Sequence, residues 1–179
     1  LPEAKRDAAL VLLQATYSRQ YLDDVLYTLN REVISATLDD SHRPILRDKA
    51  AYYFQHPDKD KAGMLRESIT RLLVHIGHHD DLDIYLQGVL FYHRQPVNDV
   101  AQNLRAAALA GIATVDMDLA CLYAARLIGE PDTSVFNCEP TTTAVQTLVQ
   151  AGRILPVYQF ALRTGVEFAS SARGEAVAS

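Results

Sequence analysis

Residues 75–83, HIGHHDDLD, place three histidines and three aspartates within nine positions. Imidazole and carboxylate groups are common ligands of zinc and of other transition metals. On a continuous helix His75 and His79 would share one face, because residues four positions apart are neighbours there. This interpretation makes the chain an all-helical metal-dependent hydrolase, and its candidate metal ligands are His75, His79, Asp80, Asp83 and His93.

The same stretch is also typical of a junction between two helices. Gly77 would end the first helix, because glycine readily adopts the left-handed conformation that follows many helix C-termini. His78 and His79 would then lie in the turn, and Asp80 or Asp81 would cap the next helix. We therefore predict no metal ligand, no cofactor and no catalytic residue in this stretch.

The segment LLVHIGHH, residues 72–79, resembles the LLHDIGH core of the HD-type phosphohydrolases. The resemblance implies an all-helical fold and a metal-dependent hydrolase activity, with the metal-binding His-Asp pair of the family falling on Val74 and His75. The sequence contains no HExxH, GxxxxGK[ST], GxGxxG or GxSxG pattern. A protein without catalytic activity is therefore the first prediction, and a metal-dependent hydrolase is the alternative.

The rest of the chain has the periodicity of helices. In YLDDVLYTLNREVISATL, residues 21–38, apolar side chains recur three and four positions apart. Prolines near predicted helix starts and glycines after predicted helix ends divide the chain into segments. We predict an all-α fold of about nine helices. Their approximate ranges are 2–17, 18–38, 44–56, 60–76, 81–94, 96–111, 114–128, 140–152 and 156–171.

Three glycines occupy comparable places, Gly77 in LVHIG, Gly111 in ALAGI and Gly152 in LVQAG, with spacings of 34 and 41 residues. Over residues 65–170 this pattern resembles the helical-hairpin repeats of the TPR and HEAT class, most closely in LVQAGRILPVYQFAL, residues 148–162. The resemblance implies an α-solenoid of antiparallel hairpins that serves as a protein-interaction scaffold. An irregular helical bundle is the alternative.

The bulk composition is that of a soluble globular domain, with 179 residues of which 49% are hydrophobic. We assign residues 1–171 to a single all-helical domain, which we expect to be part of a larger protein, and residues 172–179 to a frayed tail. No apolar run reaches the roughly 18 residues that a membrane span needs. We expect a cytoplasmic location.

The charge distribution argues against nucleic acid as a partner. Residues 76–179 contain 6 basic and 11 acidic side chains, and this acidic half would repel a phosphate backbone. Cys121 and Cys138 are the only cysteines and form no CxxC pattern, so we interpret them as buried thiols. The remaining partner class is another protein or a peptide, and a third hypothesis is a subunit whose apolar face is completed by oligomerisation.

Two aromatic groups could anchor such a partner. AAYYFQHP contains Tyr52, Tyr53 and Phe54, and YSRQY places Tyr17 and Tyr21 four positions apart. Aromatic side chains are enriched among the residues that dominate the affinity of protein interfaces. Core packing is the more common explanation of the first group, and a helix junction is the more common explanation of the second. The sequence thus predicts a protein-interaction or scaffold module that presents a helical surface.

Overall fold

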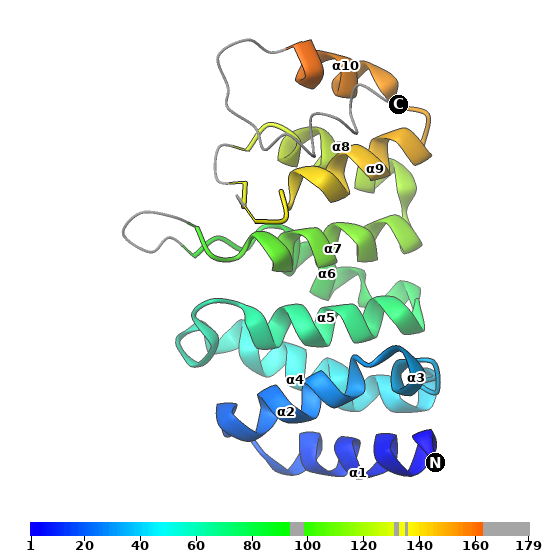
Figure 1. Ribbon diagram of the computed structural model, residues 1–179, viewed down its shortest axis with the longest axis vertical. Helices are drawn as coiled ribbons and strands as arrows, with labels where there is room; N and C mark the ends of the chain where they lie inside the picture. Colours follow the sequence, from blue (N-terminus) through cyan, green and yellow to red (C-terminus); the bar gives the residue numbers. More distant parts are fainter. Residues whose placement is uncertain (94–98, 131–132, 135, 163–179) are drawn as a thin grey trace.

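The computed structural model describes residues 1–93, 99–130, 133–134 and 136–162. Within them the chain forms ten α-helices and three short 3-10 helices, and the predicted all-α fold is confirmed (Figure 1). The α-helices are α1 (Pro2–Ala15), α2 (Arg19–Leu29), α3 (Glu32–Ser35), α4 (Arg43–Gln55), α5 (Met64–Ile76), α6 (Leu82–Val89), α7 (Gln102–Val115), α8 (Met117–Leu127), α9 (Thr141–Gln150) and α10 (Ile154–Leu162). The 3-10 helices are η1 (Asp40–His42), η2 (Pro57–Asp60) and η3 (His79–Asp81).

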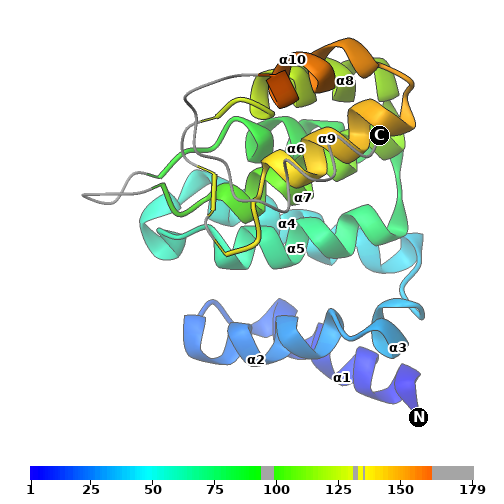
Figure 2. The ribbon, with the colours of Figure 1, turned by 45° about the horizontal axis from the view of Figure 1, so that its top comes forward.

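The helices stack along the long axis of the molecule as antiparallel hairpins. The pairs α1–α2, α4–α5, α6–α7 and α8–α9 pack on one another. Helix α5 also packs against α2 and α7, and α7 packs against α9, so these four helices form a continuous layer. Both views place α1 at one end of the stack and α10 at the other (Figures 1 and 2). The arrangement is compatible with a helical repeat, in which each hairpin covers the apolar face of its neighbour.

Two hairpins, α4–α5 and α6–α7, correspond at a shift of 39 residues. Helix α4 begins at Arg43 after η1, and α6 begins at Leu82 after η3. A short sequence pattern recurs at the start of α5 and of α7. It is DKAGMLR at residues 60–66 and DVAQNLR at residues 99–105, and the two share Asp, Ala, Leu and Arg at the same positions. This shift replaces the glycine-based spacings of 34 and 41 residues, because Gly111 lies inside α7 and not at a helix end.

Gly111 lies inside α7, where its missing side chain allows close packing against α6, and it forms no turn. A Cβ atom at this position would lie 2.7 Å from the ring of the buried Tyr85 on α6. Gly77 and Gly152, in contrast, have positive φ angles of 75° and 68° and follow α5 and α9. Only two of the three glycines therefore have the predicted role.

Other helix boundaries also differ from the sequence prediction. The helix expected over residues 18–38 is interrupted after Leu29, where the Asn30 side chain donates hydrogen bonds to the carbonyl oxygens of Leu26 at 2.9 Å and Ser68 at 3.2 Å. These bonds end α2 and tie its end to α5. The predicted start at Pro96 and the predicted ends at 94 and 171 lie outside the described residues, as does the tail at 172–179.

Replacing Gly111 with alanine should lower the free energy of unfolding by about 1–3 kcal/mol, because the added Cβ would overlap the Tyr85 ring. Urea denaturation followed by circular dichroism measures the change. In a Tyr85→Ala background the same substitution should be neutral or stabilising by up to about 1 kcal/mol, since alanine favours a helix over glycine. An equal loss in both backgrounds would contradict the steric explanation.

Each of the two corresponding hairpins contains a fully buried ion pair. The Asp60 carboxylate accepts hydrogen bonds from the backbone N–H groups of Leu65 at 3.2 Å and Arg66 at 3.0 Å, and from the Arg66 Nε at 3.1 Å. The second pair joins Asp99 to Arg105. In both hairpins an aspartate that precedes the second helix is therefore tied to an arginine in the first turns of that helix.

The dipeptide Phe91–Tyr92, which follows α6, lies against both buried arginines. The Arg66 guanidinium carbon is 3.8 Å from the centre of the Phe91 ring, and that of Arg105 is 4.2 Å from the centre of the Tyr92 ring. Arg105 also donates a hydrogen bond of 3.2 Å to the Phe91 carbonyl oxygen. One short segment thus connects the two hairpins through cation–π contacts.

Candidate functional site

The HIGHHDDLD stretch is a helix junction in the structure. Gly77 has the left-handed conformation and its N–H donates to the Leu73 carbonyl oxygen at 2.9 Å, which ends α5. His78 follows in an extended conformation, and its Nδ1 accepts a 3.2 Å hydrogen bond from the backbone N–H of Asp80. His75 and His79 therefore belong to different helices and do not share a helix face.

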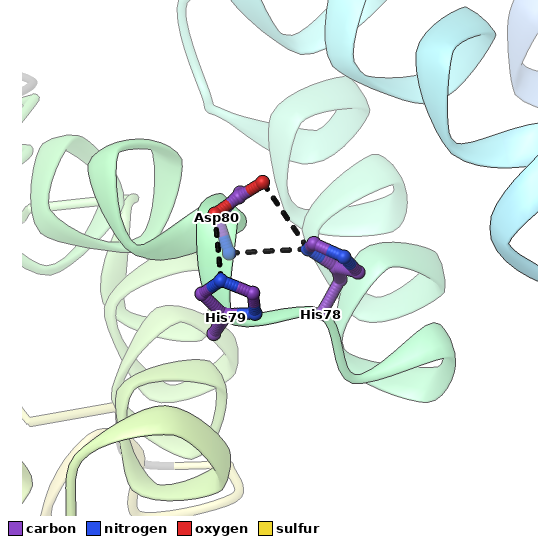
Figure 3. Close-up of side chains that lie close together, drawn as sticks. All are labelled: His78, His79 and Asp80. Atoms are coloured by element: carbon purple, nitrogen blue, oxygen red, sulfur yellow. Dashed lines mark hydrogen bonds and ion pairs between the residues drawn. The ribbon is translucent and has the colours of Figure 1, made fainter.

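Three side chains of the stretch converge after this junction (Figure 3). The His79 Nε2 lies 2.9 Å from Asp80 Oδ1, and the His78 Nδ1 lies 3.8 Å from Asp80 Oδ2. The two imidazole rings stack with their centres 4.6 Å apart. In the described part of the chain, His78, His79 and Asp80 are the group whose ligand atoms lie close enough to hold a metal ion. Of the five candidate ligands from the sequence, His79 and Asp80 belong to this group, whereas His75, Asp83 and His93 do not.

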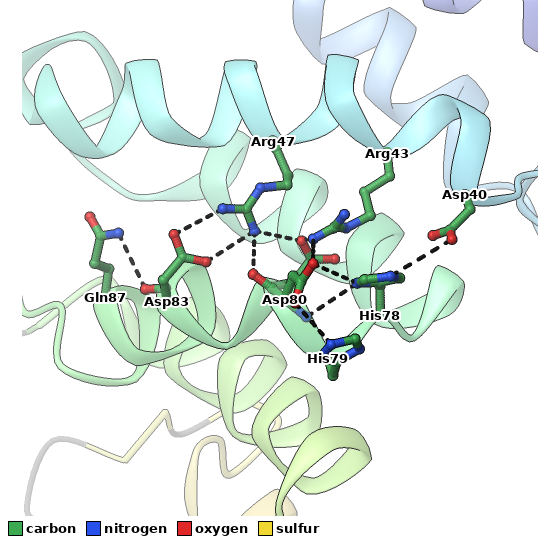
Figure 4. A network of polar contacts seen from close by, with 9 residues as sticks. Asp40, Arg43, Arg47, His78, His79, Asp80, Asp83 and Gln87 are labelled. Carbon is green, nitrogen blue, oxygen red and sulfur yellow. Dashed lines mark hydrogen bonds and ion pairs between the residues drawn. The ribbon is translucent and has the colours of Figure 1, made fainter.

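Two arginines of α4 face this junction (Figure 4). Arg43 Nε and Arg47 Nη1 lie 2.9 Å and 2.7 Å from Oδ1 of Asp81, whose side chain is fully buried. Arg47 also donates two hydrogen bonds of 3.0 Å to the Asp83 carboxylate. Hydrogen bonds to Asp83 are the main cause that raises the pKa of Arg47 above its ordinary value. We call the set Asp40, Arg43, Arg47, His78, His79, Asp80, Asp81 and Asp83 the polar junction.

The predicted aromatic anchors come together in part. The rings of Tyr17 and Tyr52 lie 4.4 Å apart, and Tyr52 also stacks on His56. Tyr53 is only 1% exposed, and burial raises the pKa of its hydroxyl to about 12. Tyr53 is thus a core residue with no surface to offer a partner.

The other two predicted anchors differ in exposure. Phe54 is half-buried and its ring lies 5.5 Å from the Arg66 guanidinium carbon, so it belongs to the packing around the buried ion pair. Tyr21 is largely exposed on α2. Tyr17 is exposed too, although the Lys49 ammonium lies 3.2 Å above its ring. Tyr17, Tyr21 and Tyr52 remain accessible to a partner.

A surface groove between α8, α9 and α10 has no counterpart in the sequence prediction. It has a volume of about 620 Å³, and its rim carries an ion pair of 3.1 Å between Asp118 and Arg153. Leu122 and Leu155 are 68% and 70% exposed on its walls. We call this hollow the apolar groove, and its lining residues are Asp118, Cys121, Leu122, Ala125, Leu148, Gly152, Arg153, Ile154, Leu155 and Pro156.

Comparisons of the chain with models of protein families, with curated proteins and with solved structures found no match. Among the helices of the described residues, none has the length and apolar character that crossing a membrane requires.

The predicted burial of both cysteines is confirmed, since Cys121 and Cys138 are 9% and 3% exposed.

Proposed function

We propose that this protein is an interaction module without catalytic activity of its own, whose apolar groove binds an amphipathic helix of a partner protein in the cytoplasm. The observation that carries the proposal is the exposure of Leu122 and Leu155 on the walls of one groove. Contiguous exposed apolar side chains with a polar rim mark protein-binding sites more often than isolated ones do.

The geometry of the stack supports a helix as the occupant. In the hairpins α4–α5, α6–α7 and α8–α9, each helix buries apolar side chains against its partner helix. Helix α10 packs against α9 and buries Val157 and Phe160, while Leu155, Tyr158 and Leu162 are exposed. A further helix laid along α8 and α10 would continue the packing that already joins the other helices.

The rim of the groove supports a partner whose helix is amphipathic. Asp118 and Arg153 are both mostly exposed, so their ion pair contributes little to stability and can be exchanged for contacts with a partner. Apolar side chains of the partner would contact Leu122, Ile154 and Leu155, and its polar side chains would face Asp118 and Arg153.

We also propose that the fold belongs to the helical-hairpin repeat class that includes TPR and HEAT solenoids. The shift of 39 residues between corresponding hairpins supports this, because TPR units have about 34 residues and HEAT units about 40–47. Proteins of this architecture present extended surfaces to partners.

A photo-crosslinking experiment tests the proposal. A benzophenone amino acid at Leu155 of the full chain, expressed in its source cells, should crosslink to an amphipathic helix of one partner, which mass spectrometry would locate. The purified partner should then bind Leu122→Asp/Leu155→Asp at least tenfold more weakly than the unaltered chain. Tyr27→Asp, a substitution of an exposed apolar residue on α2, is the matched control and should bind unchanged.

Three outcomes would overturn the proposal. They are the absence of any crosslinked protein, a crosslink to a second copy of this chain, and a crosslink to a partner segment that is not an amphipathic helix. All three substituted side chains are exposed, so the variants should keep the stability of the unaltered chain.

A further inference from the structure

The polar junction carries more negative than positive charge. It contains the four carboxylates of Asp40, Asp80, Asp81 and Asp83, and two guanidinium groups (Figure 4). Among the carboxylates, the arginines lie nearest to those of Asp81 and Asp83, at 2.7–3.0 Å, whereas the nearest arginine nitrogen to the Asp80 carboxylate is 3.8 Å away. The cluster thus has two more carboxylates than guanidinium groups, and His78 and His79 lie beside Asp40 and Asp80.

The hydrogen bonds of His78 determine which of its nitrogens can bind a metal. Because Nδ1 accepts the backbone hydrogen bond from Asp80, it carries a lone pair, and the ring proton is assigned to Nε2. That Nε2 faces Asp40 Oδ2 at 3.8 Å. Histidines that bind metals commonly donate a hydrogen bond from their second ring nitrogen to a carboxylate, which orients the ring and increases its basicity. The distance of 3.8 Å is too long for this bond, and a small movement of the largely exposed Asp40 side chain would form it.

The distances between the donor atoms suit a small cation. The donor atoms of His78, His79 and Asp80 lie within 4.8 Å of one another. Tetrahedral zinc with bonds of about 2.0–2.1 Å places its ligand atoms about 3.4 Å apart, so a modest contraction is needed. His79 and Asp80 are mostly exposed and can rotate, whereas the His78 side chain is 24% exposed and has less freedom.

We propose that His78, His79 and Asp80 bind a divalent transition-metal ion, with zinc as the expected ion and Asp40 as the carboxylate that orients His78. Two imidazoles and one carboxylate form a ligand set that zinc accepts, and water completes the coordination. The ion would replace the hydrogen bond between His79 and Asp80 and the one that His78 accepts. It would fix the turn between α5 and α6. The site is separate from the apolar groove and does not depend on the proposed function.

Isothermal titration of the chelator-treated full chain with zinc chloride at pH 7.5 tests this site. The unaltered chain should bind one zinc ion saturably. His79→Ala and Asp80→Asn should each weaken the affinity at least tenfold, and Asp40→Asn should weaken it about tenfold, as the loss of an orienting carboxylate commonly does. His75→Ala, which removes an exposed imidazole one turn earlier, is the matched control and should bind zinc unchanged.

Two results would overturn the zinc site. One is the absence of saturable one-to-one binding by the unaltered chain. The other is an equal affinity of the His79→Ala and His75→Ala variants, which would mean that zinc binds to surface histidines without selection. Circular dichroism of each variant shows whether it is folded, and the mostly exposed positions of His79 and Asp80 make a folding defect unexpected.

Discussion

Replacing Asp60 with alanine should lower the free energy of unfolding by about 3–5 kcal/mol, because the buried charge of Arg66 would lose its carboxylate partner. Both side chains are fully buried, so the guanidinium group would be left without its counter-ion in a desolvated environment. The substitution also removes the acceptor for the backbone N–H groups of Leu65 and Arg66 at the start of α5. Urea denaturation followed by circular dichroism measures the loss.

Two further substitutions separate the causes of this effect. Asp58→Ala changes an exposed carboxylate two positions earlier and should alter the free energy of unfolding by less than about 0.5 kcal/mol. Asp60→Asn keeps one hydrogen-bond acceptor but removes the charge. It should therefore lower the free energy of unfolding by less than Asp60→Ala and by more than Asp58→Ala. A loss below about 1 kcal/mol for Asp60→Ala would show that Arg66 finds another partner or solvent.

Asp81→Ala should lower the free energy of unfolding by about 2–4 kcal/mol, because Asp81 is the buried carboxylate that joins α6 to two arginines of α4. The expected loss is smaller than for Asp60, since Arg43 and Arg47 are partly exposed and can be hydrated once the carboxylate is removed. The same denaturation experiment measures it.

Asp83→Ala is the matched control for this second prediction. Asp83 also contacts Arg47, at 3.0 Å, but its side chain is largely exposed. Asp83→Ala should lower the free energy of unfolding by less than about 1 kcal/mol, as is usual for the loss of an exposed ion pair. If Asp83→Ala were as destabilising as Asp81→Ala, burial would not be what distinguishes the two aspartates.

The all-α fold could be predicted from the sequence because the helical period and the proline and glycine positions are local signals. The correspondence between the α4–α5 and α6–α7 hairpins could not be aligned from glycines alone. Gly77 ends a helix, whereas Gly111 makes room for the Tyr85 ring, and the residue type does not distinguish these roles. The better signal was the pattern Asp-x-Ala-x-x-Leu-Arg, which occurs at residues 60–66 and 99–105 and marks both buried ion pairs.

The candidate site could be predicted only where its residues are adjacent in the chain. Gly77 separates His75 from His79, so the spacing of four positions had no structural consequence. Arg43 and Arg47 lie more than thirty positions before Asp81, and nothing local indicates that they meet it. The apolar groove combines side chains from three helices, and its existence depends on how those helices pack.

The Phe91–Tyr92 segment has a consequence for how the molecule unfolds. In arrays of helical hairpins each unit contacts only its neighbours, and such arrays can lose their units one at a time. Here Phe91, which follows α6, stacks on Arg66 of α5, so separating the two hairpins removes the ring that covers this buried guanidinium group. The segments α4–α5 and α6–α7 should therefore open as one cooperative unit, with equal protection of their slowest-exchanging amides against hydrogen exchange.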